Sequence, residues 1–97
     1  MQARKSSLDA TRKADVLNRL KSVRGHVDAV IKMVDDDTYC VQVIKQIAAC
    51  RAALDHVSRI ELHNHLEHCV VDQIKTGKSH DAVAELMDIL NLRRGVA

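Results

Sequence analysis

Proline, tryptophan and phenylalanine are absent from this 97-residue chain, which also has a single tyrosine and only three glycines. The shortage of aromatic residues argues against a β-sandwich or barrel, and the absence of proline leaves long helices uninterrupted. The large side chains that usually fill the core of a small domain are missing as well. We therefore expect an all-α protein whose medium-sized aliphatic side chains pack against other copies of the chain.

Long apolar runs and a strong charge imbalance are lacking too. No stretch approaches the ~18 apolar residues that span a membrane, and the N-terminal residues lack the apolar core of a signal peptide. The 15 basic and 13 acidic residues give a net charge of +2, which permits nucleic-acid binding without requiring it. The composition predicts a single cytoplasmic domain over residues 1–97, with no membrane contact and with disordered tails at 1–6 and 94–97.

The first of three predicted helices spans about residues 7–34. The acidic run at residues 35–38 is expected to end it and to cap the next helix. Gly25 lies inside this helix and should cost about 1 kcal/mol relative to alanine. Apolar residues recur alternately four and three positions apart, a pattern typical of a packed helical seam: Val16, Leu20, Val23, Val27, Val30 and Val34.

The second predicted helix is very long. Nothing between Tyr39 and Lys75 would stop it, and Gly77 is a natural C-terminal cap. A helix of ~37 residues far exceeds the mean of ~11, and such lengths usually indicate packing between chains. A third helix is predicted from Ser79, as N-cap, to about Arg93.

The segment LHNHLEHCVV, residues 62–71, concentrates candidate metal ligands. His65 and Cys69 are four residues apart and share one face of a helix. Cys40 lies 25 residues before His65, which corresponds to roughly 37 Å along a straight helix. One chain therefore cannot bring all three to one ion unless the helix breaks. Two antiparallel copies related by a two-fold axis near Ala53 and Leu54 would join Cys40 of one chain to His65 and Cys69 of the other, twice.

A simpler interpretation exists for each cysteine alone, because cysteine is often just a small buried apolar side chain. That interpretation suits Cys50 in particular, whose neighbours resemble a packed helix interior. The shared geometry of the other two cysteines with His65 favours metal binding. Four of the other five histidines are expected to be polar, surface or supporting positions: His26, His56, His63 and His68. Of these, His26 is a better candidate for an extra ligand than His56.

The candidate ligands also indicate which metal they would bind. Three cysteines are an odd number, and in a reducing compartment they favour thiols or thiolate ligands over disulfides. Two thiolates and one imidazole form a soft, low-coordinate set that suits Cu(I), with Zn(II) as the main competitor. A structural zinc site would want a fourth ligand, and nickel would want more nitrogen or oxygen donors.

Basic side chains are scattered along the first two helices. No helix-turn-helix, zinc finger, basic zipper or aromatic platform for single strands is visible, so a solvated face of mixed charge is the simpler interpretation from the residues alone. A tetramer would multiply these charges fourfold, enough for six or more phosphate contacts. The candidates for such contacts are Arg12, Arg19, Lys21, Arg24, Arg51 and Arg59.

Three motifs together resemble the copper-sensitive operon repressor family, a group of all-helical bacterial metal-sensing repressors. These are RL…RG.V in the first helix, YC at 39–40 and HLEHC at 65–69, and the resemblance covers about residues 12–92. It implies a three-helix protomer, an antiparallel dimer that forms a four-helix bundle, and a dimer of dimers. It also implies a repressor that binds operator DNA without metal and releases it on binding Cu(I), so that copper efflux or resistance genes are derepressed.

The ligand types resemble the copper-sensing branch of that family. Its Cys, His and Cys positions correspond to Cys40, His65 and Cys69, whereas nickel- or cobalt-sensing members have histidine at the last position. By the same resemblance, Tyr39 and Glu85 are outer-shell residues that couple the site to the DNA-binding surface.

Two alternatives remain open at this point. His26 stands where the family commonly has glutamine, and if it reaches the site, a Ni(II)- or Zn(II)-responsive repressor becomes reasonable. The second alternative is a protein that stores or delivers copper or zinc and does not bind DNA. No acid–base pair, phosphate loop or H-E-x-x-H motif is present, so an enzyme is not expected.

Overall fold

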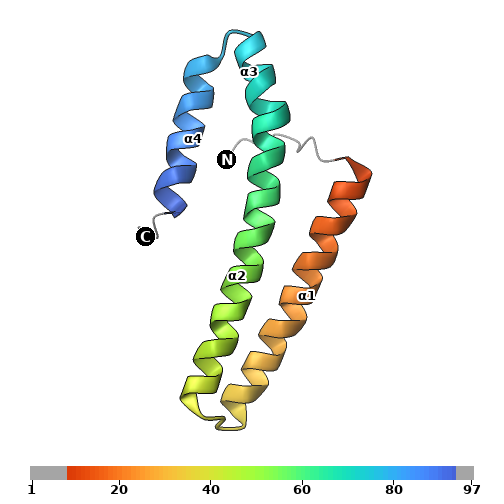
Figure 1. Cartoon of the computed structure of the whole chain (residues 1–97), viewed down its shortest axis with the longest axis vertical. Helices are drawn as coiled ribbons and strands as arrows, with labels where there is room; N and C mark the ends of the chain where they lie inside the picture. Colours follow the sequence, from red (N-terminus) through yellow and green to blue (C-terminus); the bar gives the residue numbers. More distant parts are fainter. Residues whose placement is uncertain (1–8, 94–97) are drawn as a thin grey trace. The chain divides into compact units, whose positions relative to one another are not determined.

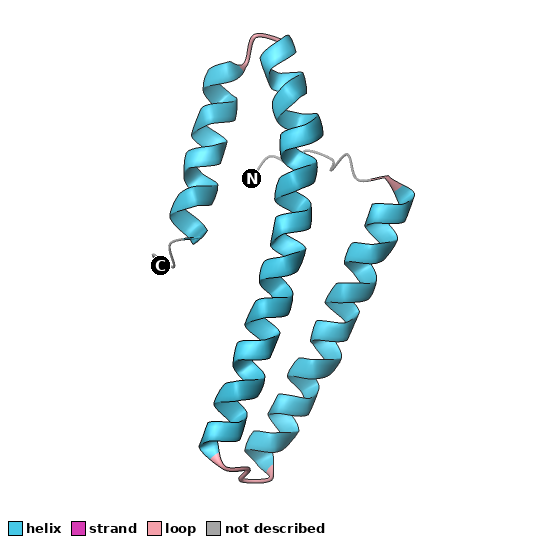
Figure 2. Cartoon of the chain, viewed as in Figure 1, coloured by secondary structure: helices cyan, strands magenta, loops and turns pink. Residues whose placement is uncertain are grey.

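The computed structural model describes residues 9–93, which form helices joined by short turns (Figures 1 and 2). No strand occurs in that range, so the expected all-α class is confirmed. The tails expected to be disordered, residues 1–6 and 94–97, lie outside the described residues. The elements in chain order are α1 (Ala10–Asp35), α2 (Cys40–Asn64), the π-helix η1 (His65–Val70), α3 (Val71–Lys75) and α4 (Ser79–Arg93).

The chain divides into two compact units, residues 1–62 and 63–97. Within its described residues, the first unit contains α1 and α2 up to Leu62, and the second contains the end of α2 followed by η1, α3 and α4. None of the helices in the described range is both long and apolar enough to cross a lipid bilayer.

An aspartate fixes the start of α1. Asp9 has an extended backbone (φ −70°, ψ 169°), and its side-chain Oδ1 accepts a 2.8 Å hydrogen bond from the backbone N–H of Arg12. This satisfies one of the donors that a helix leaves unpaired at its N-terminus. The helix therefore begins at Ala10, a few residues later than the sequence pattern predicts.

The end of α1 confirms that the acidic run ends this helix. The expected capping of the next helix by the same run is not confirmed, because Tyr39 directly precedes α2 and its carbonyl accepts from the N–H of Val43 at 3.3 Å. Asp37 adopts the left-handed conformation (φ 57°) that glycine usually occupies after a helix. Its N–H donates to the carbonyl of Val34 at 3.1 Å, and the N–H of Thr38 donates to the carbonyl of Met33 at 2.9 Å. These two bonds pair the last carbonyls of the helix and turn the chain into α2.

In the first unit, α1 and α2 run antiparallel side by side (Figure 1). Val16 and Val23 of the predicted seam are buried, together with Cys50 and Val57 of α2. Of the other seam residues, Val30 is half-buried and three are exposed: Leu20, Val27 (42% exposed) and Val34. Since a two-helix contact buries only a narrow row, the seam is confirmed in part, and the rest of it remains available to another chain.

The predicted long helix is helical from Cys40 to Lys75, but it is not uniformly α-helical. The backbone at Asn64 is helical (φ −61°, ψ −42°), as it is at Val70 and Val71, so no turn separates α2, η1 and α3. The six residues of η1 instead have the wider π-helical hydrogen bonding. The expectation is thus confirmed in extent and wrong in detail over residues 65–70.

Gly77 ends α3, as predicted, with a left-handed backbone (φ 77°). Its N–H donates to the backbone carbonyl of Ile74 at 3.2 Å, and the N–H of Lys78 donates to the backbone carbonyl of Gln73 at 2.7 Å. This is the hydrogen-bond pattern of a Schellman cap. Ser79 is the first residue of α4 rather than its N-cap, because the carbonyl of Lys78 already accepts from the N–H of Ala82 at 3.1 Å.

Candidate metal centre

Two of the predicted ligands lie in the π-helical segment. His65 opens η1 and Cys69 is four residues further on, both half-buried. Four residues slightly exceed one α-helical turn, and they fall just short of one wider π turn, so both side chains stay on the same side. π-helical turns are rare and occur frequently at functional sites. The segment is therefore the strongest local candidate for chemistry in the chain.

The imidazole of His65 lacks a hydrogen bond at one nitrogen. Its Nε2 atom is buried and has no hydrogen-bond partner, which ordinarily costs about 1–3 kcal/mol. A ligand or a rearranged neighbour would remove that cost. The chemistry of this donor set, an under-coordinated imidazole beside a thiol, fits a soft metal ion.

Cys40, the third predicted ligand, is the first residue of α2 and is exposed. It lines an open hollow of about 340 Å³ with apolar neighbours that include Val34, Val43 and Ile44. Tyr39, immediately before it, is 69% exposed. A thiol at the edge of an exposed apolar surface is placed where a second chain can cover it.

Cys40 belongs to the first unit, whereas His65 and Cys69 belong to the second. Within residues 9–93, no three histidine, cysteine, aspartate or glutamate side chains gather into a metal-binding group. All three cysteines of the sequence, including the buried Cys50, are thiols rather than disulfides. The sharing of one site between two chains therefore remains a prediction, and it requires assembly.

Glu85, expected beside the site, is half-buried on α4 and accepts a hydrogen bond at Oε1 from the side-chain Nε2 of Gln73 on α3. Gln73 is only 3% exposed, and its Oε1 is buried without a partner. Sequence reasoning missed Gln73, because glutamine within a helix is normally a solvent-facing residue. Its position between the apolar Val70 and Ile74 offers no distinguishing signal.

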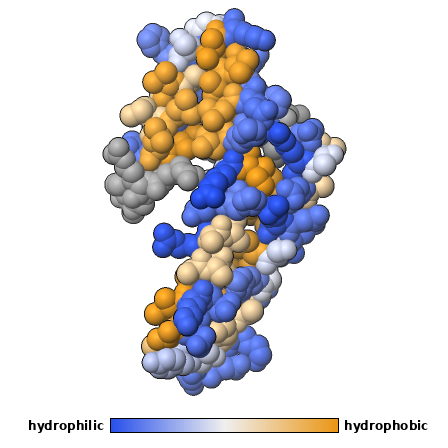
Figure 3. All heavy atoms as spheres, viewed as in Figure 1, coloured by the Kyte–Doolittle hydropathy of each residue, from blue (hydrophilic) through white to orange (hydrophobic). Residues whose placement is uncertain are grey.

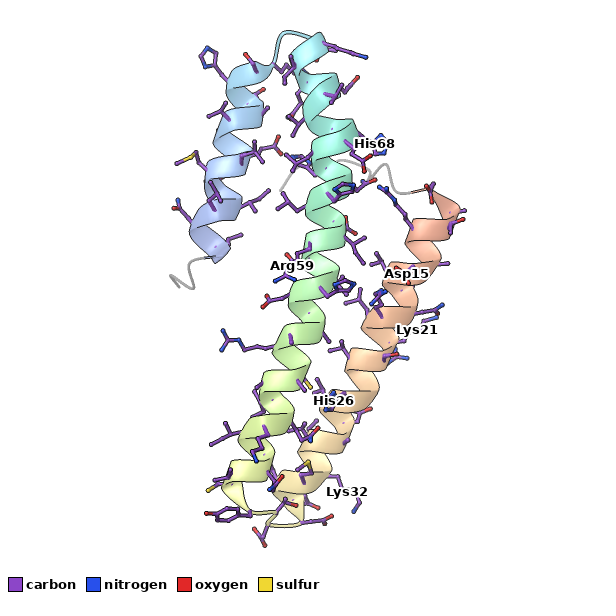
Figure 4. The ribbon with its side chains drawn as sticks, viewed as in Figure 1. Asp15, Lys21, His26, Lys32, Arg59 and His68 are labelled. Atoms are coloured by element: carbon purple, nitrogen blue, oxygen red, sulfur yellow. The ribbon has the colours of Figure 1, made fainter. Side chains whose placement is uncertain are left out.

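Three of the other histidines differ in their surroundings. His26 of α1 is hydrogen-bonded through Nε2 to Oε1 of Gln46 on α2 at 2.7 Å, which gives it a structural partner within the first unit. His63 is exposed and its Nε2 lies 2.7 Å from Oε1 of Glu67. His68 is exposed as well (Figure 4).

The basic candidates all belong to the first unit. Arg12 is half-buried and the other five are exposed; Arg19 pairs with Asp15 at 3.0 Å on the surface of α1. Lys21 and Arg59 project from opposite sides of the α1–α2 pair in the view of Figure 4. A single chain therefore does not collect all six on one face.

One hollow between α1 and α2 brings some polar groups together. It measures about 330 Å³ and is lined on the α1 side by Arg19, Ser22, Val23 and His26, and on the α2 side by Ala53 and His56. Arg19 and His56 thus border the same surface, a relation that no sequence spacing indicates.

The fold and the distribution of cysteine and histidine define an all-helical protein with candidate metal ligands near both ends of one long helical segment. Residues 12–91 match the sequence model of a family described as metal-sensitive transcriptional repressor. The chain belongs to this family.

Two curated relatives and one solved structure give this membership more detail. The chain is 46% identical over 77 residues to the copper-sensing transcriptional repressor CsoR of Mycobacterium tuberculosis (strain H37Rv), covering 79% of this chain and 65% of that protein. It is 42% identical over 77 residues to the protein of the same name from Bacillus subtilis (strain 168), covering 79% and 76%. The chain thus spans slightly less than two thirds of the length of the mycobacterial relative.

The solved structure is the copper-sensing repressor CsoR with Cu(I) from Geobacillus thermodenitrificans NG80-2. The match has a TM-score of 0.82 and 34% sequence identity, and covers 97% of this chain and 94% of that one. The fold is therefore shared along almost the whole length of both chains.

Proposed function

We propose that the protein is a Cu(I)-responsive transcriptional repressor. It binds operator DNA in the metal-free state and releases it on binding Cu(I), so that genes for copper efflux or resistance are expressed. The observation that carries this proposal is the divided ligand set: His65 and Cys69 share one π turn, and Cys40 is exposed at the start of α2. Relatives named as copper-sensing repressors support the choice of metal.

Cys40 of one copy, with His65 and Cys69 of a second copy, would hold Cu(I). Two thiolates and an imidazole are the soft donors that this ion prefers, and they need no fourth ligand. Ion binding at a site shared between chains favours the arrangement that brings its two halves together. Tyr39, next to Cys40, and Glu85 on α4 would respond to that arrangement as outer-shell groups.

Exposed apolar side chains support assembly into an antiparallel homodimer, and of two dimers into a tetramer. In the first unit, Ile44 is 63% exposed and Leu54 is 45% exposed. In the second unit, apolar residues gather over α3 and α4 on the face shown in Figure 3, and Val83 and Met87 are more than half exposed. Exposed apolar surface of this extent marks interaction sites, and a second copy of the chain is the partner that the divided site requires.

The DNA-binding surface would be built from several chains. Six basic candidates per chain lie in the first unit, and a tetramer repeats them four times, which allows the many phosphate contacts that dominate affinity. Because Cu(I) weakens operator binding in this proposal, bound operator must weaken Cu(I) affinity by the same factor. This regulatory role places the protein in the cytoplasm, beside its DNA.

Fluorescence anisotropy with the DNA upstream of the gene tests the proposal, under anaerobic conditions, with and without Cu(I). We expect tight binding without metal and a weakening of roughly 5- to 150-fold with Cu(I), the usual range for allosteric coupling. Absence of binding at low salt would contradict a repressor and favour a copper storage or chaperone protein.

The same titration with Ni(II) and Zn(II) separates the metals. The hydrogen bond between His26 and Gln46 favours the three-ligand copper site over a four-ligand site that includes His26. If Ni(II) or Zn(II) releases the protein from DNA at a lower free concentration than Cu(I) does, the protein is a sensor of that metal and not of Cu(I). X-ray absorption of the Cu(I) complex should show two sulfur ligands and one nitrogen ligand.

A further inference from the structure

Among the described residues of the second unit, two buried side-chain polar atoms have no hydrogen-bond partner: Nε2 of His65 and Oε1 of Gln73. The nearby Glu85 is hydrogen-bonded to one of these two residues, because its Oε1 accepts from the side-chain Nε2 of Gln73. Leaving a buried polar atom unpaired is costly, and in native proteins such atoms call for an explanation. The unpaired Nε2 of His65 is accounted for if the hydrogen bonding of Glu85 differs between the two states of the protein, because a carboxylate can accept from a protonated ring nitrogen.

The hairpin formed by α3 and α4 indicates where Glu85 stands. Cys69 and Glu85 lie equally far from Gly77 in the sequence, so in an antiparallel pair they are roughly level. Gln73 is then about one turn toward the hairpin, and His65 about one turn away from it, each some 5–6 Å along the axis. A Glu85 side chain directed toward Gln73 is therefore directed away from His65.

An imidazole that binds a metal through one ring nitrogen carries its proton on the other, and that N–H needs an acceptor. In the described part of the second unit, the carboxylate of Glu85 suits this task, but Gln73 holds it. Swinging the carboxylate to His65 breaks one hydrogen bond and makes another. Metal binding therefore requires the hydrogen bond between Gln73 and Glu85 to break. The stronger this bond is, the more it lowers the affinity for the metal.

We propose that Gln73 is a positioning residue that holds Glu85 away from His65 in the metal-free protein and so sets the Cu(I) concentration at which the repressor responds. The inference rests on the proposed function and adds a residue to it. Gln73 touches neither the metal nor the DNA in this arrangement. It acts by stabilising the metal-free state of the α3–α4 hairpin.

The test replaces Gln73 by methionine, which has a similar length and no hydrogen-bonding amide. Cu(I) affinity is measured anaerobically by competition with a chromophoric chelator, and Q73M should bind Cu(I) about three- to tenfold more tightly than wild type, as loss of one competing hydrogen bond predicts. Q46M is the matched control, since Gln46 also makes one side-chain hydrogen bond, to His26 in the first unit. It should leave Cu(I) affinity unchanged.

Nuclear magnetic resonance of the ¹⁵N-labelled wild-type protein gives a second readout that does not depend on a variant. The side-chain amide signals of Gln73, assigned by their absence from Q73M, should shift when Cu(I) is added, because the bond to Glu85 breaks. Signals that stay unchanged on Cu(I) binding would overturn the inference.

The outcomes separate the inference from the function on which it rests. A wild-type protein that binds neither Cu(I) nor its upstream DNA overturns the proposed function, and the inference with it. A wild-type protein that does both, with Q73M of equal or weaker Cu(I) affinity, overturns only the role of Gln73. Weaker binding would mean that Gln73 prepares Glu85 for His65 instead of withholding it.

Discussion

Cys40 and Cys50 are the same residue type on the same helix, yet their surroundings differ sharply. Cys40 is exposed at the first position of α2, and Cys50 is 7% exposed among the core residues of the first unit. Burial alone thus separates a thiol that can reach a second chain from one that fills space. The difference predicts opposite consequences for the same substitution.

Replacement of Cys40 by alanine should abolish the Cu(I) response and leave metal-free operator binding intact, because the site loses one of its three ligands. Anisotropy titrations with and without Cu(I) measure both properties. The control Cys50→Ala should keep the response and lower the free energy of unfolding by about 1 kcal/mol through lost packing. A Cys40→Ala protein still released from DNA by Cu(I) would exclude Cys40 as a ligand.

Asp37 carries backbone strain that a substitution can remove. A non-glycine residue at φ 57° costs about 1 kcal/mol, so Asp37→Gly should raise the free energy of unfolding by about that amount. Urea denaturation at fixed protein concentration provides the measurement. Gly77→Ala, at φ 77°, makes the reverse change and should destabilise by a similar amount. Destabilisation by Asp37→Gly would show that its side chain contributes more than the strain costs.

At the scale of helices, the sequence is most informative where a local side chain decides the outcome. The end of α1 at the acidic run and the end of α3 at Gly77 follow from cap chemistry within a few residues, and both are confirmed. The π-helical geometry of residues 65–70 could not be predicted, because no glycine, proline or change of apolar period marks it. The apolar seam of α1 was predicted as one row, but only Val16 and Val23 are buried.

The candidate site divides in the same way. Spacing along the chain identified His65 and Cys69 as neighbours, and the structure places both in η1. Gln73 and its bond to Glu85 could not be predicted, because they depend on how α4 folds back on α3. Contacts between elements require the tertiary structure, whereas contacts within one turn require only the helical repeat.

The exposed apolar face of α2 should mediate self-association. Leu54 is 45% exposed, close to the expected two-fold axis, so Leu54→Asp places a charge in the proposed interface and should shift the protein to smaller species. Sedimentation velocity over a range of concentrations measures the shift. Lys45, about 180° round the helix from Leu54, gives the control Lys45→Asp, which should leave the association state unchanged. Equal association of Leu54→Asp and wild type would exclude this face.

At the scale of the whole molecule, a divided ligand set makes assembly a condition for sensing. Neither unit contains all three candidate ligands, since Cys40 lies in one and His65 and Cys69 in the other. A site completed by a second copy couples ion binding directly to the arrangement of chains, and therefore to the spacing of their basic surfaces on DNA. The family to which the chain belongs regulates transcription in response to metals, which is consistent with such coupling.

Mixing two inactive variants tests the shared site most directly. Cys40→Ala and Cys69→Ala chains should each bind no Cu(I) tightly, but a mixture that is unfolded and refolded together contains heterodimers in which one site has all three ligands. Random pairing makes half of the dimers mixed, so we predict on the order of one Cu(I) for every four chains. A mixture that binds no more Cu(I) than the separate variants, while wild type binds fully, would contradict a site shared between chains.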